Sequence, residues 1–119
     1  PMVEALGSLL TRSRHRAVEV GLLLHVLAGI FFGMFYTWAL MAIGQPGVVM
    51  CLFLGVLIGL LHGILFSICL IVIVAESHPL EEFKQASIVV AFVHALAHVI
   101  YGALVGFVIG LSGLVHSIS

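Results

Sequence analysis

Residues 47–74 read GVVMCLFLGVLIGLLHGILFSICLIVIV, and this stretch decides the fold class. It contains no Asp, Glu, Lys or Arg, and its one imidazole belongs to His62. A helix rises about 1.5 Å per residue, so about 20 apolar residues are enough to cross the roughly 30 Å hydrocarbon core of a bilayer. The stretch therefore predicts a transmembrane helix.

Two further segments, residues 18–43 and residues 86–115, are equally long and apolar. Over the 119 residues of the chain, 63% are hydrophobic and 8% are charged, whereas a soluble domain is roughly half apolar and a quarter charged. We therefore predict an all-α fold, an integral membrane three-helix bundle that forms a single domain over residues 1–119. Its spans are expected at about 18–43, 47–74 and 86–115. The few Lys and Arg residues argue against a nucleic-acid partner.

The segment before the first span predicts a short interfacial helix over residues 2–16. Its apolar side chains fall on one side: Val3, Leu6, Leu9 and Leu10. The helix ends in a basic stretch that holds Arg12, Arg14 and Arg16. Positive residues beside a span favour the cytoplasmic side, so we expect a cytoplasmic N-terminus and, after three crossings, a C-terminus on the opposite side.

The two connections between the spans differ in charge. Residues 44–47 form an uncharged turn, whereas residues 76–84 hold most of the remaining charge. In this second connection, Ser77 and Pro79 suit the start of a helix that begins in water. The alternative is a metal or partner contact through four side chains: Glu76, His78, Glu81 and Glu82.

Small residues recur at every fourth position in all three spans. Such spacing lines one helix face and lets the backbones of two helices approach closely. We expect these glycines to pack the helices together: Gly29, Gly33, Gly55, Gly59, Gly63, Gly102, Gly106 and Gly110. Cys51 and Cys69 lie 18 residues apart in one span, about 27 Å along the helix, and cannot bridge each other.

Four histidines lie inside the spans, where ionisable residues are rare and are candidates for function. They are His25, His62, His94 and His98. All four fall in the half of the bilayer nearer the N-terminus, about 10–18 Å deep at 1.5 Å per residue, and on or near the glycine faces. If these faces meet, the imidazoles form a polar layer. That layer is either structural or a site for haem b or a transition metal, or it is a proton relay. We expect the other histidines, His15, His78 and His116, to be solvated.

Three spans that carry histidines resemble in architecture the small haem-carrying anchor subunits of succinate dehydrogenase. The resemblance implies haem binding, but the first span lacks the Ser and Arg expected beside a quinone, and Val26 follows His25 where Arg is expected. The sequence from His98 to Gly102, followed by Gly106, is similar to small bacterial membrane proteins. This second similarity implies a multi-pass protein of a bacterial inner membrane and no particular activity.

These patterns favour a small, non-catalytic accessory or structural subunit over an enzyme. There is no Asp in the chain and no phosphate-binding glycine loop. We expect the partners to be the lipid bilayer and either other membrane subunits or further copies of the chain. The alternatives are a haem- or metal-binding subunit for electron transfer and a proton or ion pathway.

Overall fold

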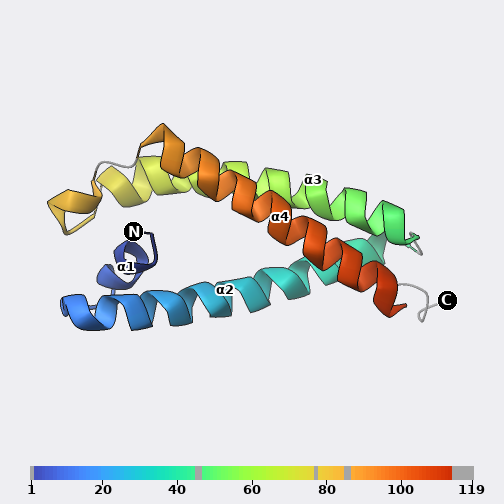
Figure 1. Cartoon of the computed structure of the whole chain (residues 1–119), viewed down its shortest axis with the longest axis horizontal. Coiled ribbons are helices and arrows are strands. Elements are labelled where there is room, and N and C mark those ends of the chain that lie inside the picture. The colour runs from blue at the N-terminus through green and yellow to red at the C-terminus, as the bar shows by residue number, and fades with distance from the viewer. Residues whose placement is uncertain (1, 45–46, 77, 85–86, 114–119) are drawn as a thin grey trace.

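The computed structural model describes residues 2–44, 47–76, 78–84 and 87–113, and these residues contain helices and no strand (Figure 1). The prediction of an all-helical chain is thus confirmed. The elements follow in the order α1 (Met2–Ser8), α2 (Arg14–Ile43), α3 (Val48–Cys69), the π-helix η1 (Leu70–Ala75), the 3₁₀ helix η2 (Glu81–Phe83) and α4 (Ile88–Ser112).

Three of these helical stretches, residues 14–43, 48–72 and 88–112, are long and apolar enough to cross a membrane. They run in alternating directions along a molecule 52 Å long, so that α1 and the η1–η2 connection lie at one end and residue 44 at the other (Figure 1). Long apolar helices therefore lie where the three spans are predicted, with ends that differ from the predicted bounds by two to four residues at most positions.

The ends of the long helices have local causes. Gly44 and Gly113 have positive φ angles of 80° and 68°, a backbone conformation that glycine adopts without steric cost and that stops a helix. At the start of α4, the hydroxyl of Ser87 accepts a hydrogen bond from the N–H of Val90 at 3.3 Å. Helix α4 therefore begins at residue 88, and the segment around Pro79 that we predicted as its first turn is a bend followed by η2.

The N-terminal helix is shorter than the predicted interfacial helix over residues 2–16. Helix α1 stops at Ser8, a turn follows in which the N–H groups of Leu10 and Thr11 both donate to the carbonyl of Gly7, and α2 already starts at Arg14. The turn lets α1 fold back onto α2. The two backbones touch there, because a Cβ added at Gly7 would collide with the carbonyl of Ala17.

Helices α3 and α4 make the most extensive interhelix contact. A Cβ placed on any of six glycines, three on each helix, would lie under 3.0 Å from the backbone of the facing helix; they are Gly55, Gly59, Gly63, Gly102, Gly106 and Gly110. The hydroxyl of Ser67 also donates to the carbonyl of Ala91 at 2.9 Å. These six glycines, on two of the three long helices, thus bring α3 and α4 together.

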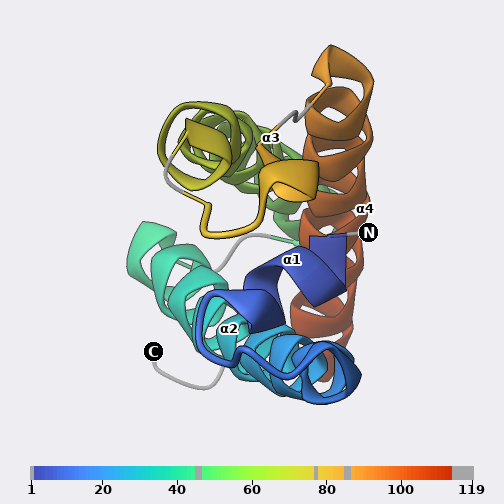
Figure 2. The same cartoon turned by 90° about the vertical axis from the view of Figure 1, so that its left-hand side faces the viewer.

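Helix α2 stands apart from this pair over much of its length (Figures 1 and 2). A Cβ at Gly29 would meet nothing within 4 Å, and one at Gly33 would meet only the hydroxyl of Tyr101. Gly29 and Gly33 therefore meet no neighbouring backbone, whereas Gly21 of the same helix packs against the backbone of α1. Helix α1 and the η1–η2 connection occupy the space between α2 and the α3–α4 pair at one end of the molecule (Figure 2).

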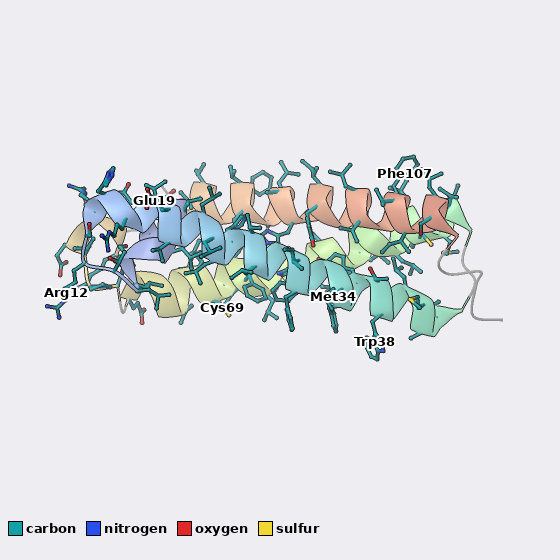
Figure 3. All side chains as sticks on the ribbon, turned by 90° about the horizontal axis from the view of Figure 1, so that it is seen from below. Arg12, Glu19, Met34, Trp38, Cys69 and Phe107 are labelled. Atoms are coloured by element: carbon teal, nitrogen blue, oxygen red, sulfur yellow. The ribbon has the colours of Figure 1, made fainter. Side chains whose placement is uncertain are left out.

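Charge is confined to the same end of the molecule. Arg12 and Glu19 lie there, whereas the apolar side chains of Met34, Trp38 and Phe107 project outward farther along the helices (Figure 3). These three side chains are exposed, as are large apolar side chains on every long helix. Cys51 and Cys69 are both thiols. The long helices thus present an apolar outer surface and a single polar end.

Candidate functional site

Three histidines and two tyrosines meet where α2, α3 and α4 come closest along the middle of the molecule. We call these five residues the histidine–tyrosine cluster: Tyr36, His62, His94, His98 and Tyr101. The ring centroids of His94 and His98 are 4.3 Å apart, and those of His98 and His62 are 4.6 Å apart. The predicted polar layer is therefore assembled from α3 and α4, with a tyrosine from α2.

His62 is enclosed by aromatic side chains. The rings of Phe32 and Phe66 lie with their centroids 4.1 Å and 4.6 Å from the His62 ring. Its Nδ1 is 2.9 Å from the hydroxyl of Tyr36, a side chain that is 1% exposed. An apolar wall with one phenol fixes the orientation of the imidazole and leaves its Nε2 directed away from Tyr36.

His94 and His98 lie one turn apart on α4. The Nδ1 of His98 is 2.8 Å from the backbone carbonyl of His94. A carbonyl oxygen can only accept a hydrogen bond, so Nδ1 of His98 carries a proton and donates it to this bond. The neutral His98 ring therefore keeps its lone pair on Nε2. Both imidazoles are partly buried.

Tyr101 joins α4 to α2. Its hydroxyl donates to the carbonyl of Gly29 at 2.5 Å, and its ring lies 5.6 Å from that of Tyr36. A Cβ at Gly29 would meet nothing within 4 Å, so the Tyr101 hydroxyl reaches the Gly29 carbonyl from another direction. Together with the bond between Tyr36 and His62, this contact is the polar tie between α2 and the α3–α4 pair.

Of the four histidines proposed from the sequence, the structure brings His62, His94 and His98 into contact and leaves His25 at the margin. His25 is exposed on α2, although it is near enough to His94 for their positive charges to repel if both are protonated. The reason is that α2 diverges from α4 towards the N-terminal end, where α1 fills the space between them (Figure 2).

Sequence reasoning missed the tyrosines. Tyr36 and Trp38 lie near the end of the first predicted span, where aromatic side chains are typical of the headgroup region. Trp38 is exposed, but Tyr36 is buried against His62. The sequence did contain a signal for Tyr36. His25, Gly29, Gly33 and Tyr36 follow one another at successive spacings of four, four and three residues, which places all four on one helix face. Tyr101 follows His98 by three residues and shares its face in the same way.

The fit of the cluster to a metal or to haem can be judged from its geometry. Within the described residues, no three His, Cys, Asp or Glu side chains are grouped so that they could hold a metal ion. Two axial imidazoles on one iron need their nitrogens about 4 Å apart on opposite sides of the metal, since each such bond is about 2.0 Å. The rings of His62 and His98 touch at an interplanar angle of 63°. They would have to separate before a porphyrin plane could lie between them.

The second polar site is a buried histidine at the charged end. His78, expected to be solvated, is 1% exposed. Its Nε2 is 3.0 Å from the carbonyl of Ala5 and 3.2 Å from the hydroxyl of Ser8, and its Nδ1 lies 3.1 Å from the N–H of Leu80. One neutral tautomer satisfies this arrangement, with Nε2 donating to Ala5 and Nδ1 accepting from Leu80. The expectation was wrong because α1 folds back over the imidazole.

The acidic connection uses its carboxylates in ion pairs. Both oxygens of Glu82 lie 2.6 Å from Nη2 of Arg14, whose Nε is 3.4 Å from Glu4. Lys84 pairs with Glu81 at 2.5 Å. The metal or partner contact proposed for this connection therefore has no preformed ligand group among these side chains.

His15 is exposed as expected, and Ser77 and His116 lie outside the described residues.

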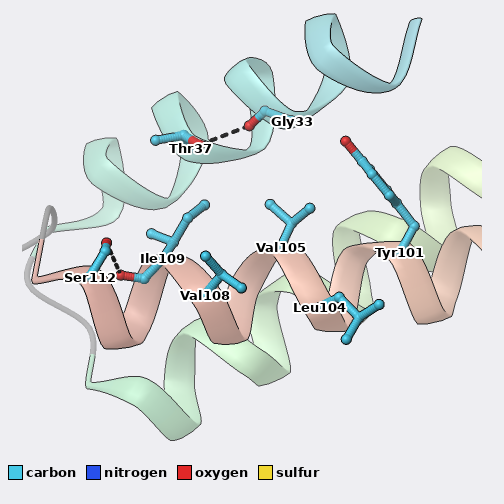
Figure 4. Close-up of a pocket in the computed structure, with 8 residues that line it drawn as sticks. All are labelled: Gly33, Thr37, Tyr101, Leu104, Val105, Val108, Ile109 and Ser112. Carbon is cyan, nitrogen blue, oxygen red and sulfur yellow. Dashed lines mark hydrogen bonds between the residues drawn. The ribbon is translucent and has the colours of Figure 1, made fainter. Parts of the chain in front are cut away.

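An apolar groove runs along the gap between α2 and α4, on the far side of Tyr101 from the histidines (Figure 4). It has a volume of about 450 Å³ and is lined from α2 by Gly33 and Thr37. The wall from α4 consists of Tyr101, Leu104, Val105, Val108, Ile109 and Ser112. Thr37 turns its hydroxyl to the Gly33 carbonyl at 2.8 Å, and Ser112 bonds the Ile109 carbonyl at 2.7 Å, so the hydroxyls are satisfied within their own helices.

Comparison with known proteins gives no match: no family model, no curated protein and no solved structure is similar to this chain.

Proposed function

We propose that this chain is an integral membrane protein that serves as a small, non-catalytic accessory or structural subunit of a larger membrane assembly or homo-oligomer. Three long apolar helices support the membrane location. The arginines just before and in the first turn of α2, Arg12, Arg14 and Arg16, support a cytoplasmic N-terminus, in a bacterial inner membrane, and α1 then lies at the cytoplasmic interface.

The observation that carries the proposal is the groove between α2 and α4. Because lipid tails are as apolar as the helix surfaces, helices associate in a bilayer by close packing and hydrogen bonds. Six glycines already serve the α3–α4 contact, but Gly29 and Gly33 meet no backbone. Among the described residues only short segments lie outside the three long helices, so this part of the chain meets a partner largely between the helices. A transmembrane helix of that partner can pack against the apolar surface of the groove, where Gly33 has no side chain to keep it at a distance.

The proposal is tested by photocrosslinking with a matched control. Val108 lines the groove, whereas the adjacent Phe107 lies on another face of α4 at the same depth. A photoreactive residue is placed at each position in turn, and the protein is irradiated in its own membrane. We expect Val108 to crosslink to a transmembrane segment and Phe107 to give lipid adducts only.

Native mass spectrometry then separates the two kinds of partner, because a homo-oligomer shows multiples of 12.7 kDa and a hetero-complex shows other subunits. A lone monomer, extracted gently, that also gives no protein crosslink from Val108 would contradict the proposal.

A haem- or metal-binding subunit is the second candidate: His62, His94 and His98 come into contact, but their rings would have to rearrange before they could hold a metal ion or a haem. The test is the visible absorption spectrum of protein purified from its own membrane. A Soret band that disappears in His98→Ala would support haem binding, and a colourless protein free of bound metal would dismiss this candidate.

A further inference from the structure

The histidine–tyrosine cluster forms an ordered row of rings along the molecule. Seven residues separate His94 from Tyr101 on α4, about 10 Å along the helix. His94 lies nearest the charged end, His98 touches both His94 and His62, and His62 is bonded to Tyr36. The row is continuous, and every imidazole in it has at least one other imidazole in contact.

The hydrogen bonds leave this row able to accept a proton. His98 uses its Nδ1 proton for the His94 carbonyl, so its Nε2 lone pair is the accepting position. A phenol can donate or accept, so His62 keeps its bond to Tyr36 with the ring proton on either nitrogen. Neither ring needs to lose its present hydrogen bond when it becomes positively charged.

We infer that the cluster is a proton-binding site whose three imidazoles share one excess proton. A hydronium ion gives its proton to Nε2 of His98 and leaves water. The His62 and His98 rings are in contact, with centroids 4.6 Å apart, and turn so that Nε2 of His98 faces Nε2 of His62. The N–H bond on His98 then breaks as the proton passes to the Nε2 lone pair of His62, whose Nδ1–H donates to Tyr36. His98 returns to its neutral form with its Nδ1 proton in place, and the total stays at one excess proton.

The surroundings explain why one proton is held and a second is not. Residues 20–75 and 85–119 contain no Asp, Glu, Lys or Arg, so no counter-ion lies in this part of α2, α3 or α4. The rings of Phe32 and Phe66 lie with their centroids 4.1 Å and 4.6 Å from the His62 ring, within the range of cation–π attraction to one positive ring. The other titratable groups beside the three imidazoles are Tyr36, Tyr101 and, beside His94, His25. A second charge on an adjoining imidazole is opposed by repulsion in an apolar site.

The test is ¹⁵N nuclear magnetic resonance of the histidine rings in the whole chain, reconstituted in lipid vesicles. The pH is lowered from about 8 to about 4, a range that brackets the ordinary pKa of histidine. We expect His62, His94 and His98 to change together, with one proton taken up by the three rings. His98→Gln, whose amide can still donate to the His94 carbonyl, should abolish the joint change at His62 and His94.

The matched control is His15→Gln, because His15 is exposed at the start of α2 and touches no member of the cluster. This variant should leave the joint change as it is. Three rings that titrate independently, three protons taken up, or rings that stay neutral over the whole range would each overturn the inference. A purely structural cluster gives one of these results, whether or not the chain has a protein partner.

Discussion

Gly102 and Gly29 show how differently two glycines of one spacing pattern act. A Cβ on Gly102 would collide with the carbonyl of Gly55 on α3, whereas a Cβ on Gly29 meets nothing within 4 Å. A sequence shows the spacing of such glycines, but whether a second backbone approaches them depends on how the helices cross. Replacing glycine with alanine therefore tests a close helix contact at Gly102 and an open position at Gly29.

We expect Gly102→Ala to destabilise the fold by about 1–3 kcal/mol, because the added methyl group pushes α3 and α4 apart. Gly29→Ala, the control, should be neutral or slightly stabilising, since alanine favours a helix more than glycine does. Reversible unfolding in mixed detergent micelles measures both. Equal losses in the two variants would show that α3 and α4 do not pack through their glycines.

The hydroxyl of Tyr101 is the second residue-scale test. Tyr101→Phe removes the O–H that donates to Gly29 and should cost about 1 kcal/mol of unfolding free energy, typical of a hydrogen bond between helices. Thr37→Val is the control, because the Thr37 hydroxyl bonds only within α2. A spin-label distance between α2 and α4 that widens in Tyr101→Phe, and not in Thr37→Val, would identify the cause.

At the scale of elements, the sequence predicts the three long helices well and their mutual arrangement less well. Length and hydropathy define each helix by itself, and Gly44 marks the end of α2. The position of Tyr36, by contrast, depends on how α2 packs. The face of α2 that carries His25 and Tyr36 meets α3 only in the second half of α2, where Tyr36 contacts His62. The end of α1 at Ser8 could not be predicted either, because it depends on α1 folding back onto α2. The sequence pattern that indicates this contact is much weaker than the long apolar runs that indicate the three spans.

His78 is the contact that holds α1 and the η1–η2 connection together, so its replacement should act on these elements. In His78→Leu the N–H of Leu80 loses its acceptor, at a cost of about 0.5–1.5 kcal/mol for a partly buried hydrogen bond. We expect faster hydrogen exchange in α1 and unchanged exchange in the α3–α4 contact. His15→Gln serves as the exposed control. Unchanged exchange in α1 would mean that its packing on α2 alone is sufficient.

At the scale of the whole molecule, the asymmetry of charge is the main feature. All the Arg, Lys and Glu residues belong to two segments, residues 4–19 and 76–84, that lie at one end of the molecule, and residues 20–75 contain none (Figure 1). In a bilayer this arrangement favours one orientation, because moving the charged end through the hydrocarbon core is costly, and the arginines select the cytoplasmic side.

The orientation is measurable with single cysteines. In a variant in which Cys51 and Cys69 are replaced by Ala, Thr11→Cys lies at the charged end and Gly44→Cys at the other. A membrane-impermeant maleimide added to intact cells from outside should label Gly44→Cys and should reach Thr11→Cys only after the membrane is opened. Three crossings require opposite results at these two positions, because one long helix separates them. Labelling of both cysteines from the same side would exclude a membrane-spanning α2 and, with it, the placement of the groove and the histidine–tyrosine cluster inside the bilayer.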